Sequence, residues 1–175
     1  MSASTQITPT GIERTFGENE IIVSKTDLQG KITYANDVFV RVSGYDEHEL
    51  LGAPHSLIRH PDMPRAVFKL LWDTLASGRE IFAYVNNLAR SGDYYWVLAH
   101  VTPSLDAQGR TIGYHSNRRV PDRRCLPIVN ELYASLRHAA RTQLDRREGL
   151  RTSSDLLTSA LARTGKTYDE WIWSL

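Results

Sequence analysis

The chain has 175 residues, of which 41% are apolar and 23% are charged, so its length suits one globular domain with a helical extension. Its formal net charge of +1 gives no electrostatic basis for binding nucleic acid or an anionic membrane surface. No apolar run approaches the roughly 18–20 residues that span a bilayer, the N-terminus has no secretory signal, and a single cysteine, Cys125, excludes an internal disulfide. We therefore expect a cytoplasmic protein with no direct membrane span.

The first half of the chain predicts two strands followed by helices. Residues 1–19 are rich in Ser, Thr and Gly and are expected to form a flexible or loosely docked N-terminal cap. Residues 21–24 and 31–34 are short β-prone runs joined by a turn composition, which predicts a hairpin. A helical pattern then begins at Asn36, and its clearest part is an amphipathic helix from Pro64 to near Gly78.

The second half predicts three strands and then a helical extension. Residues 81–89, 94–103 and 111–120 read as strands joined by hairpin-length turns, so the fold class is α+β, with a five-stranded antiparallel sheet and short helices on one face. A long helix is expected from Pro127 to about residue 147, a second from residue 153 to 165, and a final turn capped by Thr167.

Several motifs at fixed places resemble the PAS family of sensory domains over residues 20–120. The general part of the resemblance is Asn36-x-x-Phe39, Ser43-Gly44-Tyr45, Glu49-Leu50, Gly52 and Pro54-His55. The more specific part is similar to the FAD-binding PAS domain of bacterial aerotaxis receptors and their stand-alone relatives, and consists of Arg59-His60-Pro61-Asp62-Met63-Pro64, Trp72, Val85-Asn86-Asn87, Gly92-Asp93-Tyr94-Tyr95-Trp96-Val97 and Gly113-Tyr114-x-Ser116.

This resemblance implies a PAS fold divided into an N-terminal cap (1–19), a sensory domain (20–120) and a C-terminal helical extension (121–175). It also implies FAD as a redox-active cofactor and a redox- or oxygen-sensing role in aerotaxis without enzymatic turnover. Because a membrane anchor and a methyl-accepting coiled coil do not fit after residue 120, we expect signalling through a separate protein, such as a methyl-accepting receptor or a kinase. A homodimer is expected.

Nine residues from these motifs are predicted to hold the cofactor, and their chemistry suits a flat ring with a polar edge and an anionic diphosphate. Arg59 and His60 can donate to phosphate or to a reduced ring, with Asp62 orienting them or capping the next helix. Asn87 has both a donor and an acceptor for the polar edge. The full set is Asn36, His55, Arg59, His60, Asp62, Phe68, Trp72, Asn87 and Tyr95.

Each assignment has a purely structural alternative. Arg59 can form a surface salt bridge with Asp62, and Asn36 can act only as a helix cap. Phe68 and Trp72, four residues apart on one helix face, can be ordinary core residues. Adjacent strand residues face opposite sides, so if Tyr95 faces the cavity, then Trp96 is left for a helix or dimer contact.

Other classes of function are compared on the same residues. A flavin–cysteine photoadduct is disfavoured because Cys125 lies beyond the last predicted strand, and a flavoenzyme because no dinucleotide fingerprint or nucleophile–base pair is present. A heme sensor would use His55 or His60 as axial ligand and would differ in colour; the same histidines make a poor zinc site. The main alternative is a ligand-free PAS dimerisation or adaptor module that pairs through the helix after Pro127.

Overall fold

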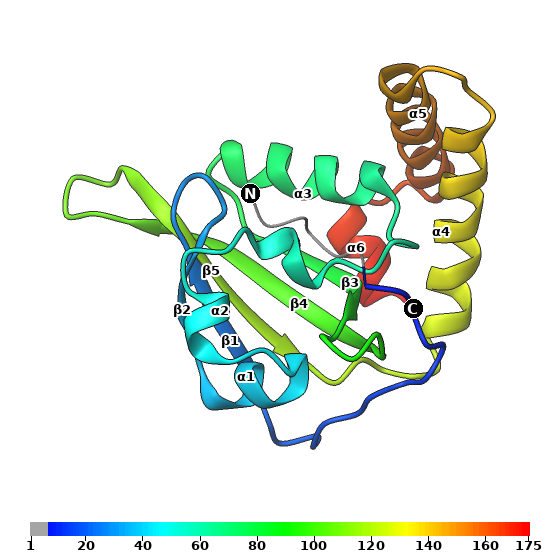
Figure 1. Ribbon diagram of the computed structural model, residues 1–175. Helices are drawn as coiled ribbons and strands as arrows, with labels where there is room; N and C mark the ends of the chain where they lie inside the picture. Colours follow the sequence, from blue (N-terminus) through cyan, green and yellow to red (C-terminus); the bar gives the residue numbers. More distant parts are fainter. Residues whose placement is uncertain (1–6) are drawn as a thin grey trace.

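The fold is built on one antiparallel sheet whose strands lie in the order β2-β1-β5-β4-β3 (Figure 1). A computed structural model describes residues 7–175. The strands are β1 (Ile22–Thr26), β2 (Ile32–Ala35), β3 (Ile81–Leu88), β4 (Tyr94–Leu105) and β5 (Thr111–Arg119). The predicted α+β class with a five-stranded antiparallel sheet is thereby confirmed.

Two of the hairpin turns use the same local chemistry. The Asp27 carboxylate accepts hydrogen bonds from the backbone N–H groups of Gln29 and Lys31, both at 2.9 Å, and Asp106 does the same in the β4–β5 turn. Gly30 ends the first turn at a φ of 78°, where a side chain would be strained. This turn composition is the signal that made both hairpins predictable from the sequence.

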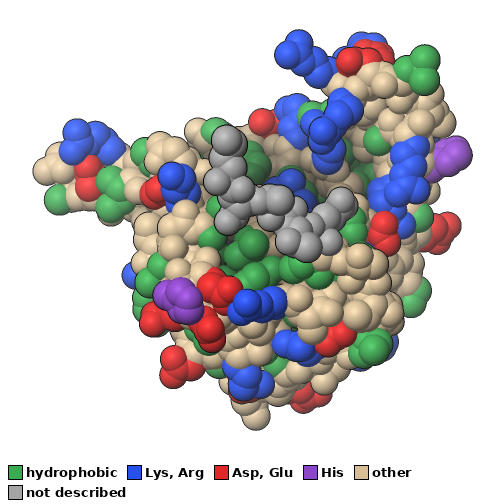
Figure 2. Space-filling model, in the orientation of Figure 1, with side chains coloured by type: hydrophobic (Ala, Val, Ile, Leu, Met, Phe, Trp, Pro, Cys, Tyr) green, Lys and Arg blue, Asp and Glu red, His purple; other side chains and the backbone are tan. Residues whose placement is uncertain are grey.

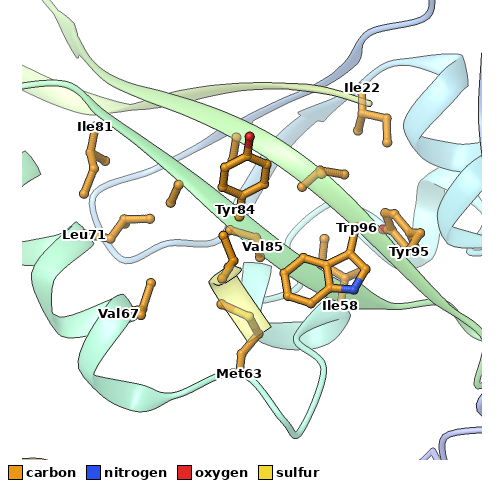
Figure 3. Packing of buried hydrophobic residues seen from close by; sticks show 14 of the residues in the cluster. Ile22, Ile58, Met63, Val67, Leu71, Ile81, Tyr84, Val85, Tyr95 and Trp96 are labelled. Atoms are coloured by element: carbon orange, nitrogen blue, oxygen red, sulfur yellow. The ribbon is translucent and has the colours of Figure 1, made fainter. Parts of the chain in front are cut away.

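Short helices cover the front face of the sheet. They are α1 (Asp37–Ser43), α2 (Glu47–Leu50), the 3-10 helix η1 (His55–Ile58) and α3 (Arg65–Ala76). Val67 and Leu71 project from α3 toward the side chains of Ile81 and Val85 on β3 (Figure 3). These apolar side chains are almost fully buried and form part of a single core, so α3 is fixed above the sheet by hydrophobic packing.

The C-terminal extension forms three helices, α4 (Leu126–Arg141), α5 (Arg146–Thr164) and α6 (Tyr168–Trp173). The expected boundary between the first two was wrong. The first helix ends before Leu144, which is fully exposed, and the second begins at Arg146, where the Asp145 carboxylate accepts from the N–H groups of residues 147 and 148. Within α5, a Cβ on Gly149 would lie 2.5 Å from the Ala140 carbonyl oxygen, so the two helices approach closely there. The predicted cap at Thr167 is confirmed.

Side chains of this extension cover the outer edge and rear face of β3. The Tyr133 hydroxyl donates to the Tyr84 carbonyl at 2.7 Å, and the Asp169 carboxylate accepts from the Phe82 N–H at 3.0 Å. On the rear face, the Trp96 ring lies 6.3 Å from that of Tyr133, which is the helix contact expected for Trp96. An edge strand that would otherwise present unpaired backbone groups is therefore covered by the chain's own C-terminus.

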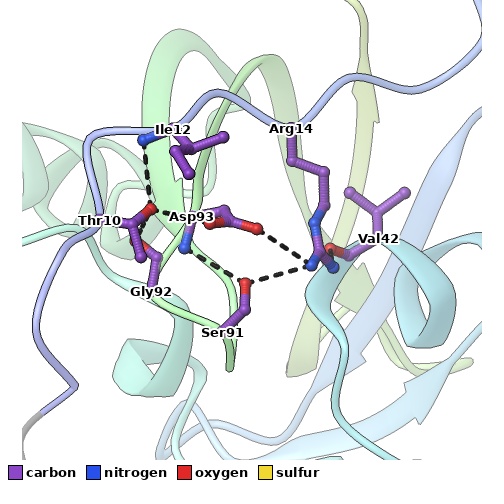
Figure 4. A network of polar contacts seen from close by, with 7 residues as sticks. All are labelled: Thr10, Ile12, Arg14, Val42, Ser91, Gly92 and Asp93. Atoms are coloured by element: carbon purple, nitrogen blue, oxygen red, sulfur yellow. Dashed lines mark hydrogen bonds and ion pairs between the residues drawn. The ribbon is translucent and has the colours of Figure 1, made fainter.

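The described part of the predicted N-terminal cap, which begins at residue 7, runs along the β3–β4 turn. Thr10 and Arg14 contact Asp93 at 2.8 and 3.3 Å, and Arg14 also donates to the Val42 carbonyl at 2.9 Å (Figure 4). Backbone bonds join Ile12 and Arg14 to Tyr94. Residues 7–14 therefore dock on the sensory domain, whereas residues 1–6 of the predicted cap lie outside the described residues.

Candidate ligand cavity

A cavity of about 310 Å³ lies between α3, η1 and the front face of the sheet. That volume is at the lower end of the range for small-molecule sites and suits a ring system. Its walls combine apolar side chains with a few polar groups and contain no carboxylate. The lining residues are Thr26, Gln29, Gly30, Pro54, His55, Ser56, Arg59, Phe68, Leu71, Trp72, Val85, Asn87, Ala99, Val101, Tyr114, Ser116 and Arg118.

Arg59 enters the cavity from the end of η1. Its guanidinium carbon lies 3.7 Å from the centre of the Phe68 ring, a cation–π contact that holds the side chain against α3. Its backbone forms an isolated antiparallel bridge with Asn87 of β3, so the two polar side chains are fixed relative to each other. Burial, and to a lesser degree the neighbouring Arg65, lowers the pKa of Arg59.

Arg118 reaches the cavity from the central strand β5 and is only 2% exposed. Its Nη2 donates to the Ser24 hydroxyl at 2.6 Å, and its guanidinium lies 4.4 Å from the centre of the Phe39 ring. Burial lowers its pKa to about 10, so the group still carries its charge at neutral pH. A charged group is thus held in the interior by one hydroxyl and one aromatic face.

His55 completes a polar chain that starts at Arg118. The Ser24 oxygen accepts from Arg118 and lies 3.0 Å from His55 Nε2, so the Ser24 proton is free to point at that nitrogen. This arrangement fits the His55 tautomer that carries its ring proton on Nδ1. Burial and the nearby Arg118 lower the pKa of His55 to about 3, so the ring is neutral at physiological pH.

The unsatisfied polar atoms of the cavity wall are donors. Buried atoms without a hydrogen-bond partner include Arg118 Nε and Nη1, Arg59 Nε and Asn87 Nδ2, together with the Thr26 hydroxyl. Leaving such groups unpaired in the interior costs about 1–3 kcal/mol each, and more for charged groups. The wall therefore fits an occupant rich in acceptors or able to carry negative charge, and the polar edge of a flavin has that character.

The structure brings five of the nine predicted residues to the cavity and leaves four outside its lining. His55, Arg59, Phe68, Trp72 and Asn87 line it. Asn36 caps α1, and its Oδ1 accepts from the N–H groups of Val23 and Phe39, both at 3.0 Å. Tyr95 faces the same side of the sheet but is completely buried within the core.

His60 and Asp62 belong to the loop that joins η1 to α3. His60 Nδ1 accepts from the Asp62 N–H at 3.1 Å, and burial lowers the pKa of this imidazole while Asp62 opposes that shift. The helix that follows has Pro64 at its cap position without a side-chain bond, so Asp62 does not cap it. These two residues shape the loop behind Arg59 rather than the cavity wall.

Sequence reasoning missed Arg118, Ser24 and the β4 residues of the wall. Strand periodicity contained the signal for Arg118, because Tyr114, Ser116 and Arg118 alternate along β5 and all three line the cavity. Two adjacent arginines on one strand, Arg118 and Arg119, must place one guanidinium on each face.

Positive charge extends beyond the cavity. A groove of about 210 Å³ between α3, α4 and α5 is lined by Arg65, Arg137, Arg141 and Arg146, with no carboxylate in its lining. Figure 2 shows Lys and Arg side chains gathered between α3 and α5. Because Arg65 also acts on Arg59, the charge of this groove reinforces the preference of the cavity wall for a negative occupant.

Comparison with known proteins agrees with this architecture. Residues 32–117 match the family described as PAS fold. The blue-light photoreceptor Aureochrome1 LOV domain has the same fold, with a TM-score of 0.56 at 24% identity over 65% of this chain and 86% of its own. These residues therefore have the PAS fold.

Among full-length proteins, the aerotaxis receptor of Escherichia coli (strain K12) is 42% identical over 135 residues, which is 77% of this chain. The nitrogen fixation regulatory protein of Klebsiella pneumoniae is 33% identical over 99 residues, which is 57% of this chain. The aligned regions span only 26% and 20% of those two proteins, so the similarity concerns one part of each. In residues 7–175 no helix combines the length and apolar character needed to cross a membrane.

Proposed function

We propose that this protein is a cytoplasmic redox or oxygen sensor that binds FAD in its PAS domain and signals to a separate partner without catalytic turnover. The observation that carries the proposal is the set of unpaired donors around an acid-free cavity, headed by the buried Arg118. The 42% identity to an aerotaxis receptor supports a sensory role and makes a chemotaxis-type receptor or kinase the partner to test.

The residues of the cavity wall would hold the cofactor through two kinds of contact. Phe68, Trp72 and Val85 offer apolar and aromatic surface to the ring, while Asn87 and the two arginines offer donors to its polar edge. When bound, a flavin supplies a ring that can be reduced and reoxidised, with a change in its charge and hydrogen bonding. Asn87 and Arg59 would rearrange first, because each has a donor without a partner in the described residues, whereas Arg118, which also has such donors, is held in place by its bond to Ser24.

Strand β3 offers a path from the cavity to the C-terminal helices. Asn87 lies on the front of this strand, while Tyr84, on the same strand, accepts a hydrogen bond from Tyr133 of α4. A shift of β3 would therefore change the seating of α4 and α6, and two alternative packings of that extension would provide the signal. A homodimer in which these helices meet their counterparts is part of the same proposal.

The decisive experiment is an absorption spectrum of the purified protein before and after dithionite, with the released cofactor identified by chromatography. We expect flavin bands that bleach on reduction, and release of FAD rather than FMN. A heme spectrum would reassign the cavity to a gas sensor. A colourless protein that takes up no added FAD would contradict the proposal and favour the ligand-free dimerisation or adaptor module.

A further inference from the structure

Within residues 7–175, Arg118 is a buried cation without an acidic partner. It is 2% exposed, none of the 17 residues that line the cavity is acidic, and two of its nitrogens, Nε and Nη1, have no partner. Burying a charge without a counter-charge costs several kcal/mol. An arginine in such a place is most simply explained if an occupant of the cavity supplies the missing negative charge or acceptors.

The side chain is also fixed in place. Its strand, β5, lies between β1 and β4, and the backbone of Arg118 is paired with Ile22 on one side and Ala99 on the other. The Ser24 hydroxyl holds Nη2, and the Phe39 ring packs on the guanidinium. Because the backbone of Arg118 and the Nη2 end of its guanidinium are both held, the charge cannot move out to solvent when the occupant changes.

We propose that Arg118 makes the cavity bind the more negative redox state of its occupant more tightly, and so raises the reduction potential of the bound flavin. This inference rests on the proposed function. Reduction with two electrons from an external reductant and one proton from solvent leaves the ring one charge more negative. A fixed, poorly screened cation stabilises that product more than the neutral oxidised ring.

Arg59 is less suited to this task. Its side chain is only partly buried, so water screens its charge, and it is held by an aromatic contact with Phe68 rather than within a strand pair. Arg118 is therefore the specificity-determining residue for redox state, and Arg59 contributes to binding in both states.

The test compares Arg118→Met, which removes the charge at similar volume, with Arg118→Lys, which keeps it. Arg119→Met is the matched control, because it removes the same charge from the adjacent, exposed position on the opposite face of β5. Each protein is loaded with FAD, and its midpoint potential is measured by titration with dithionite against a reference dye. We expect Arg118→Met to lose at least tenfold of the preference for the reduced state, which lowers the midpoint by about 30 mV for a two-electron couple. Arg118→Lys should lose less, and Arg119→Met should match the wild type.

The pH dependence of the potential gives a second readout. If the wild-type cavity holds the reduced ring as an anion, one proton enters with two electrons, and the midpoint falls by about 30 mV per pH unit. Without the cation, a second proton should enter, so Arg118→Met should fall with about twice that slope over the same range. A variant that merely loosened the fold would not change the number of protons taken up.

The outcomes separate this inference from the function on which it rests. If wild-type protein takes up no FAD, the proposed function fails. If it binds and reduces FAD but Arg118→Met has the wild-type potential and slope, only the role of Arg118 is overturned. If Arg118→Met lowered the affinity for oxidised and reduced FAD equally, the inference would also be overturned, because Arg118 would then not distinguish the two redox states. Should Arg118→Met not fold, as judged by circular dichroism, Arg118→Gln provides the same neutralisation with a polar side chain.

Discussion

The surroundings of the His55 imidazole keep it neutral far below its ordinary pKa of 6.5. It borders the cavity, receives the Ser24 proton on Nε2, and lies near the positive charge of Arg118. A second positive charge at this point would face both burial and repulsion. The ring is therefore better described as a fixed hydrogen-bonding group of the cavity than as a proton carrier.

This predicts a specific loss of stability in acid. The folded protein cannot protonate His55 until the pH approaches its pKa of about 3, whereas the unfolded chain does so near 6.5. Stability contributed by the neutral ring is complete above pH 6.5 and falls as the pH drops toward 3. Between pH 7 and pH 5 the loss should be about 1–2 kcal/mol, allowing for partial access of water from the cavity.

Urea unfolding of the wild type and of His55→Gln at both pH values checks this prediction. The glutamine variant keeps a polar group beside Ser24 but has no proton to take up, so its stability should change less between the two values by that amount. Other histidines titrate equally in both proteins and cancel in the comparison. Parallel pH profiles would contradict the proposed environment of His55.

Single residues also show what the sequence could and could not reveal about the site. His55, Arg59, Phe68, Trp72 and Asn87, which the resemblance to the PAS family predicts as cofactor-binding residues, all line one cavity. The chain of Ser24, His55 and Arg118 was not foreseen. It joins residues 94 positions apart, and only the pairing of β1 with β5 brings Ser24 beside that arginine.

At the scale of elements, β3 is the strand on which the cavity and the C-terminal helices both depend. Tyr133 has one hydroxyl proton and donates it to the Tyr84 carbonyl, so the 2.7 Å contact with Tyr168 requires Tyr168 to be the donor. The chain of hydrogen bonds therefore runs from α6 through α4 to the edge of β3. Tyr133 is its central member, with a partner on each side.

Removing the central hydroxyl should cost more than removing the terminal one. Tyr133→Phe leaves two buried groups without their partner, and we expect a loss of about 2 kcal/mol in the free energy of unfolding. Tyr168→Phe removes only one bond and should cost about 1 kcal/mol. Tyr34→Phe, at an exposed position, is the control and should be nearly neutral. Chemical denaturation measures all three, and equal losses for Tyr133→Phe and Tyr168→Phe would contradict this order.

Elements with strong local signals were predictable, and those fixed by tertiary contacts were not. The hairpin turns at Asp27 and Asp106, and the caps at Asn36 and Thr167, are short-range devices readable from neighbouring residues. The start of α5 has no apolar periodicity, because its first turns are charged and exposed. The Asp145 cap marks its first residue locally, but the close contact of Gly149 with α4 is a tertiary feature that no local pattern expresses.

At the scale of the whole molecule, the C-terminal extension surrounds the outer edge of β3, where α4 and α6 contact the strand and α5 packs against α3, the helix that borders the cavity. Any strain that the occupant imposes on β3 reaches α4 through Tyr84 and α6 through Phe82. The sensor domain and its extension are therefore mechanically connected at the strand edge. The proposed relay therefore predicts changes in the C-terminal helices when the redox state of the occupant changes.

Hydrogen exchange of FAD-loaded protein in the oxidised and dithionite-reduced states should differ within residues 120–175, most strongly in α4 and α6. Backbone amides of β3 should change with them, since the Phe82 N–H bonds to Asp169. Strand β2, which lies at the opposite edge of the sheet and contributes no residue to the cavity lining, provides the internal reference. Identical exchange across residues 120–175 in the two states would contradict the relay.

The pairing of Glu13 with Arg123 has a consequence for how such a domain can be used. Two bonds of 2.9 and 2.7 Å join the segment that precedes the sheet to the segment that follows it. The chain therefore enters and leaves the sensory domain at one pole. A unit with adjacent entry and exit points can be grafted into a surface loop of another protein without stretching its host. Fusion at these two positions would make the domain a transferable module. A change in its conformation would then reach the host protein as a small change in the distance between the two fusion points.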